Sequence, residues 1–206
     1  MSAAPVEYGP EEPARKRPKT LLDMANDISD RCPGYRVEII GGQILVSPPP
    51  DAAHARALTK IMVPFIAAGL DEDETSVVQG VGLWLPDMVD DFAVPDLSVV
   101  DADIDKHLIK HNCYDPICFR LVLEVTSSNF RTDLRVKVAA YAEARVPVYV
   151  VVDRKHQRLH VLTDPAGDEY ASHRVHAPGE IVALPDSVGA KVTLDVAHIL
   201  KAGSPG

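Results

Sequence analysis

Residues 148–153 read Val-Tyr-Val-Val-Val-Asp, a run with no alternation of polar and apolar side chains. A strand of this kind is typical of the middle of a sheet, where other elements cover both faces. Two further apolar runs, residues 92–100 and 119–125, also predict buried strands. Because helical patterns separate these runs, the chain is expected to form a single α+β or mixed α/β domain.

Cap and turn residues predict where the other elements begin and end. Thr20 and Asp23 resemble a capping box, and Gly41-Gly42 between two alternating runs is a strong hairpin signal. The remaining expected elements are a helix from Thr20 to about Pro33, strands over 35–40, 43–47 and 76–85, a helix from Asp51 to about Ala68 with a kink at Pro64, a helix from 127–129 to about Ala144, short antiparallel strands over 158–163, 169–176 and 180–184, and a helix over 195–201.

Composition limits the class of protein. The 206 residues include 46% hydrophobic ones, which suits one globular core, and residues 1–19 are expected to form a flexible tail before a domain over 20–206. No apolar run is long enough to span a bilayer or to act as a signal peptide, and three cysteines are too few and odd in number for a disulfide framework. A cytoplasmic protein with reduced thiols is therefore expected. The net charge of -9 argues against broad non-specific DNA binding but leaves room for a local basic groove.

Two acids interrupt the apolar strand candidates. Asp96 lies in Val-Pro-Asp-Leu-Ser-Val-Val and Glu124 in Leu-Val-Leu-Glu-Val-Thr. A buried carboxylate needs a partner, because an isolated buried charge is very costly. If the strands are neighbours, the two acids could hold Mg²⁺ or Mn²⁺, which prefer oxygen ligands. The alternative is that each acid independently satisfies a helix N-terminus or an arginine.

The next helix adds a third group to this hypothesis. Asp133, Lys137 and Tyr141 are spaced at i, i+4 and i+8 and so share one helix face. A lysine beside two metal-bound carboxylates can orient water and stabilise developing negative charge. The simpler reading is an exposed ion pair between Asp133 and Lys137, worth about 0.3 to 0.5 kcal/mol.

The motifs occur in a recognisable order. They are Glu38 in the first hairpin strand, the glycine pair, the three prolines followed by His54, Val-Pro-Asp96, Leu-Glu124-Val-Thr-Ser, Asp133-x3-Lys137-x3-Tyr141, and Val-Pro-Val-Tyr-Val-Val-Val-Asp153. In this order and spacing the chain resembles the Uma family of restriction endonucleases, a branch of the PD-(D/E)XK nuclease superfamily. The resemblance covers about Thr20 to Leu200.

The resemblance implies a mixed sheet flanked by helices, with Asp96 and Glu124 as metal ligands and Glu38 as a further acid near the metal. Two positions depart from the pattern. Thr126 stands where the superfamily has its lysine, a role that in this branch fits Lys137 on the following helix. Gln43 stands where the family commonly has Glu in its turn motif.

Other signals are weaker. His107, His111, Cys113 and Cys118 are four zinc-type ligands, but their spacing matches no usual finger, so a polar loop with free thiols is the favoured reading. His54 is a candidate contact to phosphate or water, although a lone histidine on a helix is more often packed or exposed. Arg131, Asp133 and Tyr141 are further candidate substrate contacts. His156, His160, His173 and His176 are expected at the surface.

These observations favour a Mg²⁺- or Mn²⁺-dependent endonuclease that hydrolyses phosphodiester bonds of nucleic acid, with DNA as the expected substrate. Asp96 and Glu124 would hold the metal, Lys137 would assist the water, and Arg131 and Arg135 would add positive charge beside the acids. The alternative is a noncatalytic module of the same fold that binds nucleic acid or a protein partner. The sequence leaves open whether the chain forms a homodimer.

Overall fold

The computed structural model describes residues 17–86, 89–126 and 134–204. The two larger sheets have six strands each, ordered β2-β1-β5-β4-β8-β7 and β12-β11-β10-β9-β6-β3, and β13 and β14 form a third, two-stranded sheet. The elements are α1 (Leu21–Arg31), β1 (Arg36–Ile40), β2 (Gln43–Ser47), α2 (Ala52–Ala67), β3 (Thr75–Val78), β4 (Gly82–Trp84), β5 (Phe92–Ala93), β6 (Leu97–Asp101), η1 (Ile104–His107), β7 (Leu108–Lys110), β8 (Cys113–Tyr114), η2 (Pro116–Cys118), β9 (Phe119–Val125), α4 (Val136–Glu143), β10 (Val148–Asp153), β11 (Arg158–Ala166), β12 (Glu169–His176), β13 (Ile181–Ala183), η3 (Asp186–Val188), β14 (Thr193–Asp195) and α5 (Val196–Ala202).

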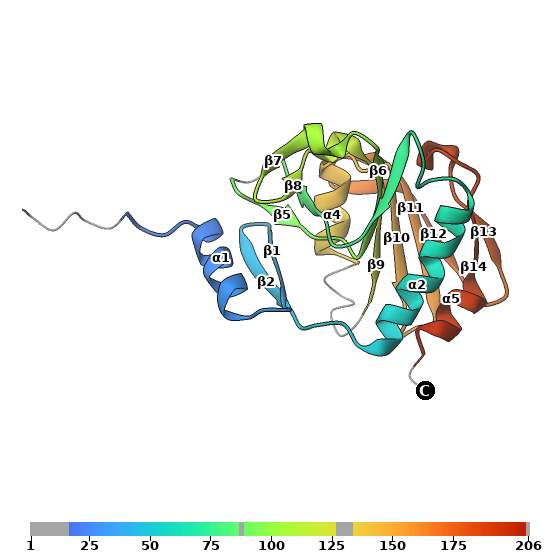
Figure 1. Ribbon diagram of the computed structural model, residues 1–206. Coiled ribbons are helices and arrows are strands. Elements are labelled where there is room, and N and C mark those ends of the chain that lie inside the picture. Colours follow the sequence, from blue (N-terminus) through green and yellow to red (C-terminus); the bar gives the residue numbers. More distant parts are fainter. Residues whose placement is uncertain (1–16, 87–88, 127–133, 205–206) are drawn as a thin grey trace, which may run out of the picture.

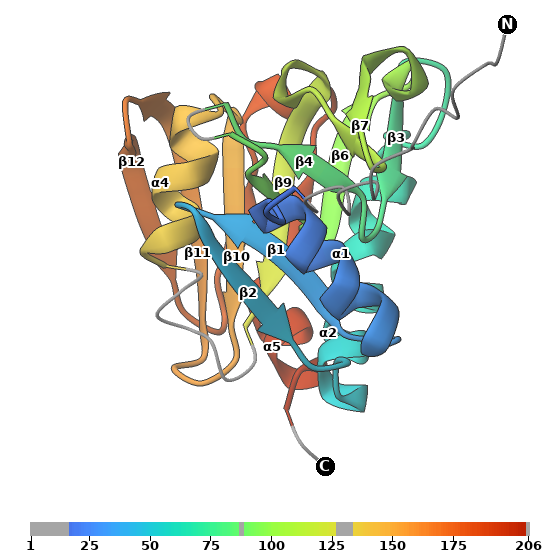
Figure 2. The ribbon, with the colours of Figure 1, turned by 90° about the vertical axis from the view of Figure 1, so that its left-hand side faces the viewer.

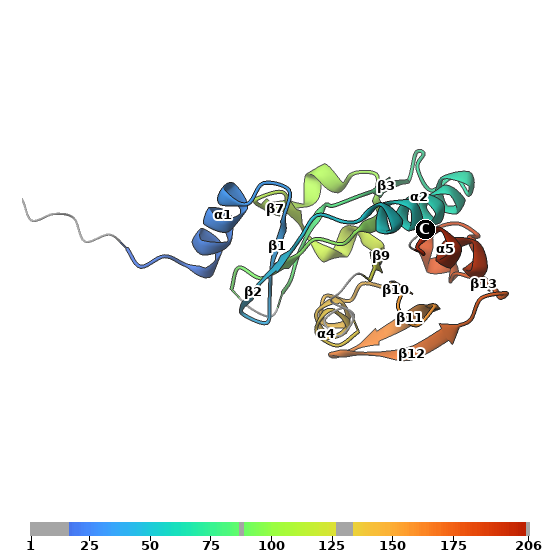
Figure 3. The same cartoon turned by 90° about the horizontal axis from the view of Figure 1, so that it is seen from below.

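The strand β10 is the middle of the second sheet, and all six of its residues are buried. Val148, Val150 and Val152 pack with α2 and α5, whereas Tyr149 and Val151 pack with α4 on the opposite face. Figure 3 shows the same layering from below. The predicted central strand with cover on both faces is therefore confirmed, as is the α+β class.

The hairpin and its helix also form as predicted. Thr20 and Asp23 make a reciprocal capping box at α1, and Gly41 and Gly42 adopt positive φ angles of 60° and 68° in the turn between β1 and β2. Such a two-residue turn needs φ above zero at both positions, which glycine allows without strain. The helix α1 packs across β1 and β2 (Figure 2).

Two predicted strands are wrong in one respect, because each is split between the two large sheets. The run 76–85 becomes β3 in one sheet and β4 in the other, and the run 92–100 becomes β5 and β6. Gly80, with a φ of 64°, and Pro95 lie at these two crossings, and the Gly80 amide donates a hydrogen bond to the Pro95 carbonyl at 3.3 Å. Proline cannot donate to a ladder, so Pro95 ends the pairing of one sheet before the next begins. The crossings place Asp96 between the sheets.

Other boundaries differ more modestly. The helix α4 begins at Val136 after a turn at Leu134 and Arg135, later than predicted, and the proposed N-cap residues 127–129 lie outside the described residues. Residues 107–118, expected to form a polar loop, contain β7, β8 and the short 3₁₀ helix η2. The helix α2 continues through Pro64 to Ala67. Most of the proposed tail, residues 1–16, also lies outside the described part.

Candidate active site between the two sheets

The strand β1 delivers two charged side chains to the space between the sheets. Val37 and Ile39 pack under α1, and the alternation of a strand sends Arg36 and Glu38 to the opposite face. Glu38 is only 2% exposed, and its Oε1 accepts a hydrogen bond from the Val94 amide at 2.8 Å. The sequence hypothesis assigned Glu38 to the site, and the structure brings it there.

Asp96 directly precedes β6 and lies beside the end of β9. Its Oδ2 accepts a hydrogen bond from the Val125 amide at 2.7 Å and lies 2.9 Å from His54 Nε2, while its Oδ1 lies 2.8 Å from Arg36 Nη1. Burial alone would raise the pKa of Asp96, but the hydrogen bond with His54, the charge of Arg36 and the Val125 amide outweigh burial and lower the pKa to about 2. Asp96 is therefore an anion at neutral pH.

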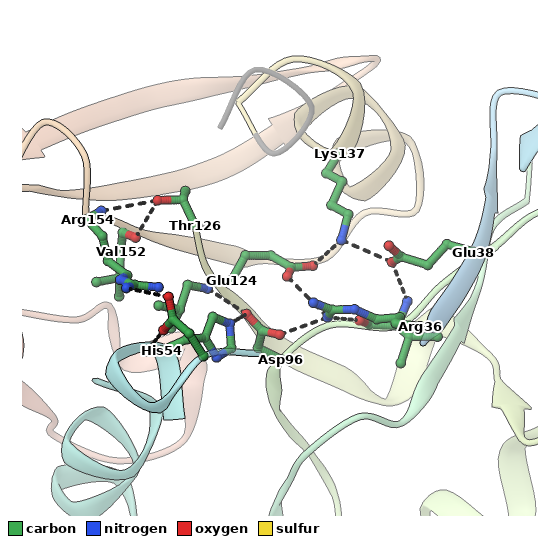
Figure 4. A network of polar contacts seen from close by, with 12 residues as sticks. Arg36, Glu38, His54, Asp96, Glu124, Thr126, Lys137, Val152 and Arg154 are labelled. Carbon is green, nitrogen blue, oxygen red and sulfur yellow. Dashed lines mark hydrogen bonds and ion pairs between the residues drawn. The ribbon is translucent and has the colours of Figure 1, made fainter. Parts of the chain in front are cut away.

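Glu124 lies on β9 and meets the buried side chains of α4. Lys137 Nζ lies 2.7 Å from Glu124 Oε1 and 3.0 Å from Glu38 Oε1, so one ammonium joins the two acids (Figure 4). The Tyr141 hydroxyl donates to Glu124 Oε1 at 2.9 Å, and burial together with the charges of Glu124 and Glu38 raises the pKa of Tyr141 well above its usual value. The predicted convergence of Glu124, Lys137 and Tyr141 is thus present in the geometry. Lys137 is only 3% exposed, which excludes the simpler reading of an exposed ion pair.

Arg36 completes the network, and the sequence reasoning missed it. Its Nη1 lies 2.8 Å from Asp96 Oδ1 and 3.6 Å from Glu124 Oε2, and it donates to the Val94 carbonyl at 2.7 Å. Burial would lower the pKa of Arg36, but the charges of Glu124, Asp96 and Glu38 raise it overall. The available signal was the i, i+2 spacing of Arg36 and Glu38 on one strand. The sequence left two interpretations of Asp96 and Glu124 open, a shared site or separate partners such as an arginine. The structure combines the two, because the acids share a site and an arginine lies between them.

The surroundings of Arg36 Nη1 also indicate whether a divalent cation fits between Asp96 and Glu124. A single cationic atom, Arg36 Nη1, lies within 3.6 Å of both Asp96 Oδ1 and Glu124 Oε2, so the two carboxylate oxygens converge on one point. Within the described part of the chain, no group of three or more His, Cys, Asp or Glu side chains could hold a metal. Two carboxylates nevertheless suit Mg²⁺, which keeps several waters and takes only one or two carboxylate ligands. The donor set therefore fits Mg²⁺ or Mn²⁺, with Arg36 competing for the same oxygens.

A cleft of about 990 Å³ gives access to this network. Its lining includes Arg36, His54 and Asp96, together with Arg154 and Lys155 at the end of β10, but Glu124 and Lys137 are not part of the lining. Asp51 caps α2 through the His54 amide at 2.6 Å and thereby fixes the first turn that carries His54. His54 is 4% exposed, and its Nδ1 has no hydrogen-bond partner among the described residues.

Thr126, which stands where the superfamily pattern has lysine, bonds to the end of β10. Its hydroxyl donates to the Val152 carbonyl at 3.2 Å and accepts from the Arg154 amide at 3.1 Å, so it ties β9 to the end of β10. Arg131 and Asp133, two of the candidate substrate contacts, lie outside the described residues.

The remaining candidates do not form a site. His107, His111, Cys113 and Cys118 fall in no metal-holding group of the described residues, and burial raises the pKa of both Cys113 and Cys118 to about 12.

The expectation of surface histidines is wrong for His160. This residue is 7% exposed, and its Nδ1 lies 2.9 Å from His173 Nε2. His160 lies on β11 opposite Val151 of the buried strand β10, and the polar character of histidine gave no sign of this buried position.

Comparisons with known proteins agree with this fold. The profile of the Uma2 family, described as "Putative restriction endonuclease", matches residues 21–197. The crystal structure of a protein described as "a putative nuclease belonging to DUF820", from Anabaena variabilis, superposes with a TM-score of 0.64 at 15% identity, covering 82% of this chain and 91% of that one. At that identity the likeness shows the shared fold. No curated protein matches the chain. By the extent of the family match, the chain belongs to the Uma2 family.

Proposed function

We propose that this chain is a divalent-metal-dependent endonuclease that hydrolyses phosphodiester bonds of nucleic acid, with DNA as its substrate. The observation that carries the proposal is the convergence of Asp96 Oδ1 and Glu124 Oε2 on one point beside an open cleft of about 990 Å³. When bound there, Mg²⁺ or Mn²⁺ would polarise the phosphate and lower the pKa of a bound water.

The chain's own residues prepare the two ligands. The low pKa of Asp96 keeps its carboxylate ionised at neutral pH without a metal. Lys137 and Tyr141 hold Glu124 Oε1, which leaves Glu124 Oε2 directed toward the shared point. Lys137 therefore acts as a positioning residue, since its ammonium is bonded to Glu124 and Glu38 rather than exposed in the cleft.

Arg36 and His54 are the side chains placed to meet a phosphate. Both line the cleft, and the Arg36 side chain is 27% exposed. A guanidinium binds phosphate oxygens in a two-pronged geometry, so Arg36 can exchange its carboxylate contacts for the substrate phosphate when a cation takes the acids. Lys155 adds positive charge along the same cleft, where Arg154 is paired with Asp51 at 3.0 Å.

One observation favours a second function, that of a noncatalytic nucleic-acid-binding module. Arg36 already neutralises Asp96 and approaches Glu124, so the centre is electrostatically satisfied without a metal. Under that reading, nucleic-acid binding would be indifferent to Mg²⁺ and to the replacement of Asp96.

A cleavage assay separates the two functions. Supercoiled plasmid and labelled DNA and RNA strands are incubated with wild-type protein in Mg²⁺, in Mn²⁺ and in EDTA, beside Asp96→Asn and the exposed-site control Asp103→Asn. We expect nicking with either metal by the wild type and by Asp103→Asn, and none in EDTA or by Asp96→Asn. Cleavage that survives in Asp96→Asn or in EDTA would contradict the proposal, and metal-independent binding without cleavage would establish the binding module.

A further inference from the structure

A basic surface lies outside the catalytic cleft, where α2 and α5 pack side by side (Figure 1). We call it the α2–α5 basic face and define it by Arg56 and Lys60 of α2 and His198 and Lys201 of α5. These four side chains, with Ala55, Thr59 and Ala202, line a shallow cleft of about 550 Å³. The lining contains no carboxylate, although the chain as a whole carries 30 acids against 21 lysines and arginines.

The cations of this face are available to an external partner. Arg56, Lys60 and Lys201 are exposed, and none of them forms an ion pair with a carboxylate among residues 17–86, 89–126 and 134–204. The whole of α2, residues 52–67, contains no Asp or Glu. By contrast, the exposed Lys106 and Lys110 each pair with an aspartate. Asp195 lies beside Lys60 and His198 in the adjoining hollow, so the cleft lining itself, rather than its whole surround, is free of carboxylates. On a protein of net charge -9, a cleft lined in this way is suited to an anionic ligand.

The face is continuous with the proposed catalytic cleft through the turn at Gly203 and Ser204. Gly203 lines the cleft, and its carbonyl accepts a hydrogen bond from Arg154 Nε at 2.8 Å. The Ser204 carbonyl accepts from Arg56 Nη2 at 3.4 Å. The turn thus links Arg154 of the cleft, which also pairs with Asp51 at 3.0 Å, to Arg56 of the basic face.

The spacing and chemistry of the face suit a phosphate backbone rather than bases. Arg56 and Lys60 are four residues apart on a helix, a rise of about 6 Å, and one strand of a duplex presents a phosphate about every 3.4 Å of axis. Arg56 and Lys60 can therefore reach different phosphates of one strand. The lining has no Phe, Tyr or Trp side chain on which a base could stack.

We propose that the α2–α5 basic face binds the phosphate backbone of duplex nucleic acid next to the phosphate held in the cleft, without reading its sequence. This inference rests on the proposed function, because it extends the same substrate beyond the cleft. Outside the acidic pocket, most of the binding energy would come from neutralisation of phosphate charge by α2 and α5. An acidic protein could bind a polyanion in this way.

The test is the salt dependence of binding to a labelled duplex, measured by fluorescence anisotropy in EDTA so that no metal-dependent cleavage occurs. The test variant is Lys60→Ala/Lys201→Ala, and the control is Lys106→Ala/Lys110→Ala, which changes the net charge equally. Each phosphate contact contributes about 0.9 to the slope of log K against log salt. We expect the test variant to reduce the slope by about 1.8, with little change for the control and the same effect on duplexes of unrelated sequence.

Equal effects of the two variants would overturn the inference, because net charge alone would then account for binding. Stronger binding to single strands than to duplex would overturn it as well. Cleavage distinguishes a failure of the basic face from a failure of the endonuclease function. Metal-dependent cleavage with an unchanged KM in the test variant would refute the basic face and leave the endonuclease intact. A slope shift without any cleavage would support the face and refute the endonuclease.

Discussion

Replacing Lys137 with methionine removes the cation that joins Glu38 and Glu124. Lys137 is 3% exposed and lies within 3.0 Å of both acids, so the change leaves two buried carboxylates facing each other. Breaking a buried ion pair by removing one partner costs about 3–5 kcal/mol. Glu124 keeps Tyr141 and the approach of Arg36, and Glu38 keeps the Val94 amide, which puts the expected loss near the lower figure.

Urea unfolding near pH 7 measures this loss, with the exposed Lys106→Met as the matched control. We expect Lys137→Met to lose about 3 kcal/mol and Lys106→Met less than about 0.5 kcal/mol. Adding Glu38→Gln to Lys137→Met should recover part of the loss, because one of the two facing charges disappears. A loss below about 1 kcal/mol, or a double variant that is simply additive, would refute the reasoning.

Three further predictions concern stability and thiol reactivity. The pKa of Asp96 is lowered from 3.8 to about 2, which corresponds to roughly 2.5 kcal/mol of folding stability. The wild type should hold this extra stability over Asp96→Asn above about pH 4, where the carboxyl of the unfolded chain is ionised. Urea titrations should show the difference disappear as the pH falls through about 2. A thiol reagent near pH 8 should modify Cys32 first, because burial raises the pKa of Cys113 and Cys118 to about 12, and rapid reaction of all three would contradict the buried positions. Gly82→Ala should cost about 1–3 kcal/mol in thermal unfolding, because its new Cβ would lie 2.6 Å from the Cys113 sulfur, and an unchanged Tm would exclude that close approach.

Local rules were enough to predict the elements whose signals are contained in a short stretch. The capping box at Thr20, the Gly41-Gly42 turn and the Asp51 cap each satisfy backbone groups within a few residues. The unbroken apolar character of residues 148–153 identified the central strand for a similar reason, since burial on both faces leaves no polar position.

Long-range pairing accounts for what the sequence did not reveal. Residues 76–85 and 92–100 look like single strands, but which sheet each half joins depends on partners elsewhere in the chain. For the same reason Arg36 was missed, because an arginine on a hairpin strand has no local sign that it will meet Asp96 and Glu124, some 60 and 88 residues later. The acids themselves were predictable because a carboxylate within an apolar run demands a partner.

Calorimetric titration with Mn²⁺ tests the central claim, that Asp96 and Glu124 form a metal site, most directly. Wild-type protein and the control Asp103→Asn are expected to bind Mn²⁺ at one site, and Asp96→Asn is expected to lose that binding. Arg36→Met should bind Mn²⁺ more tightly than the wild type, because Arg36 Nη1 competes for the same carboxylate oxygens. Absence of binding by the wild type, or equal binding by Asp96→Asn, would contradict the account.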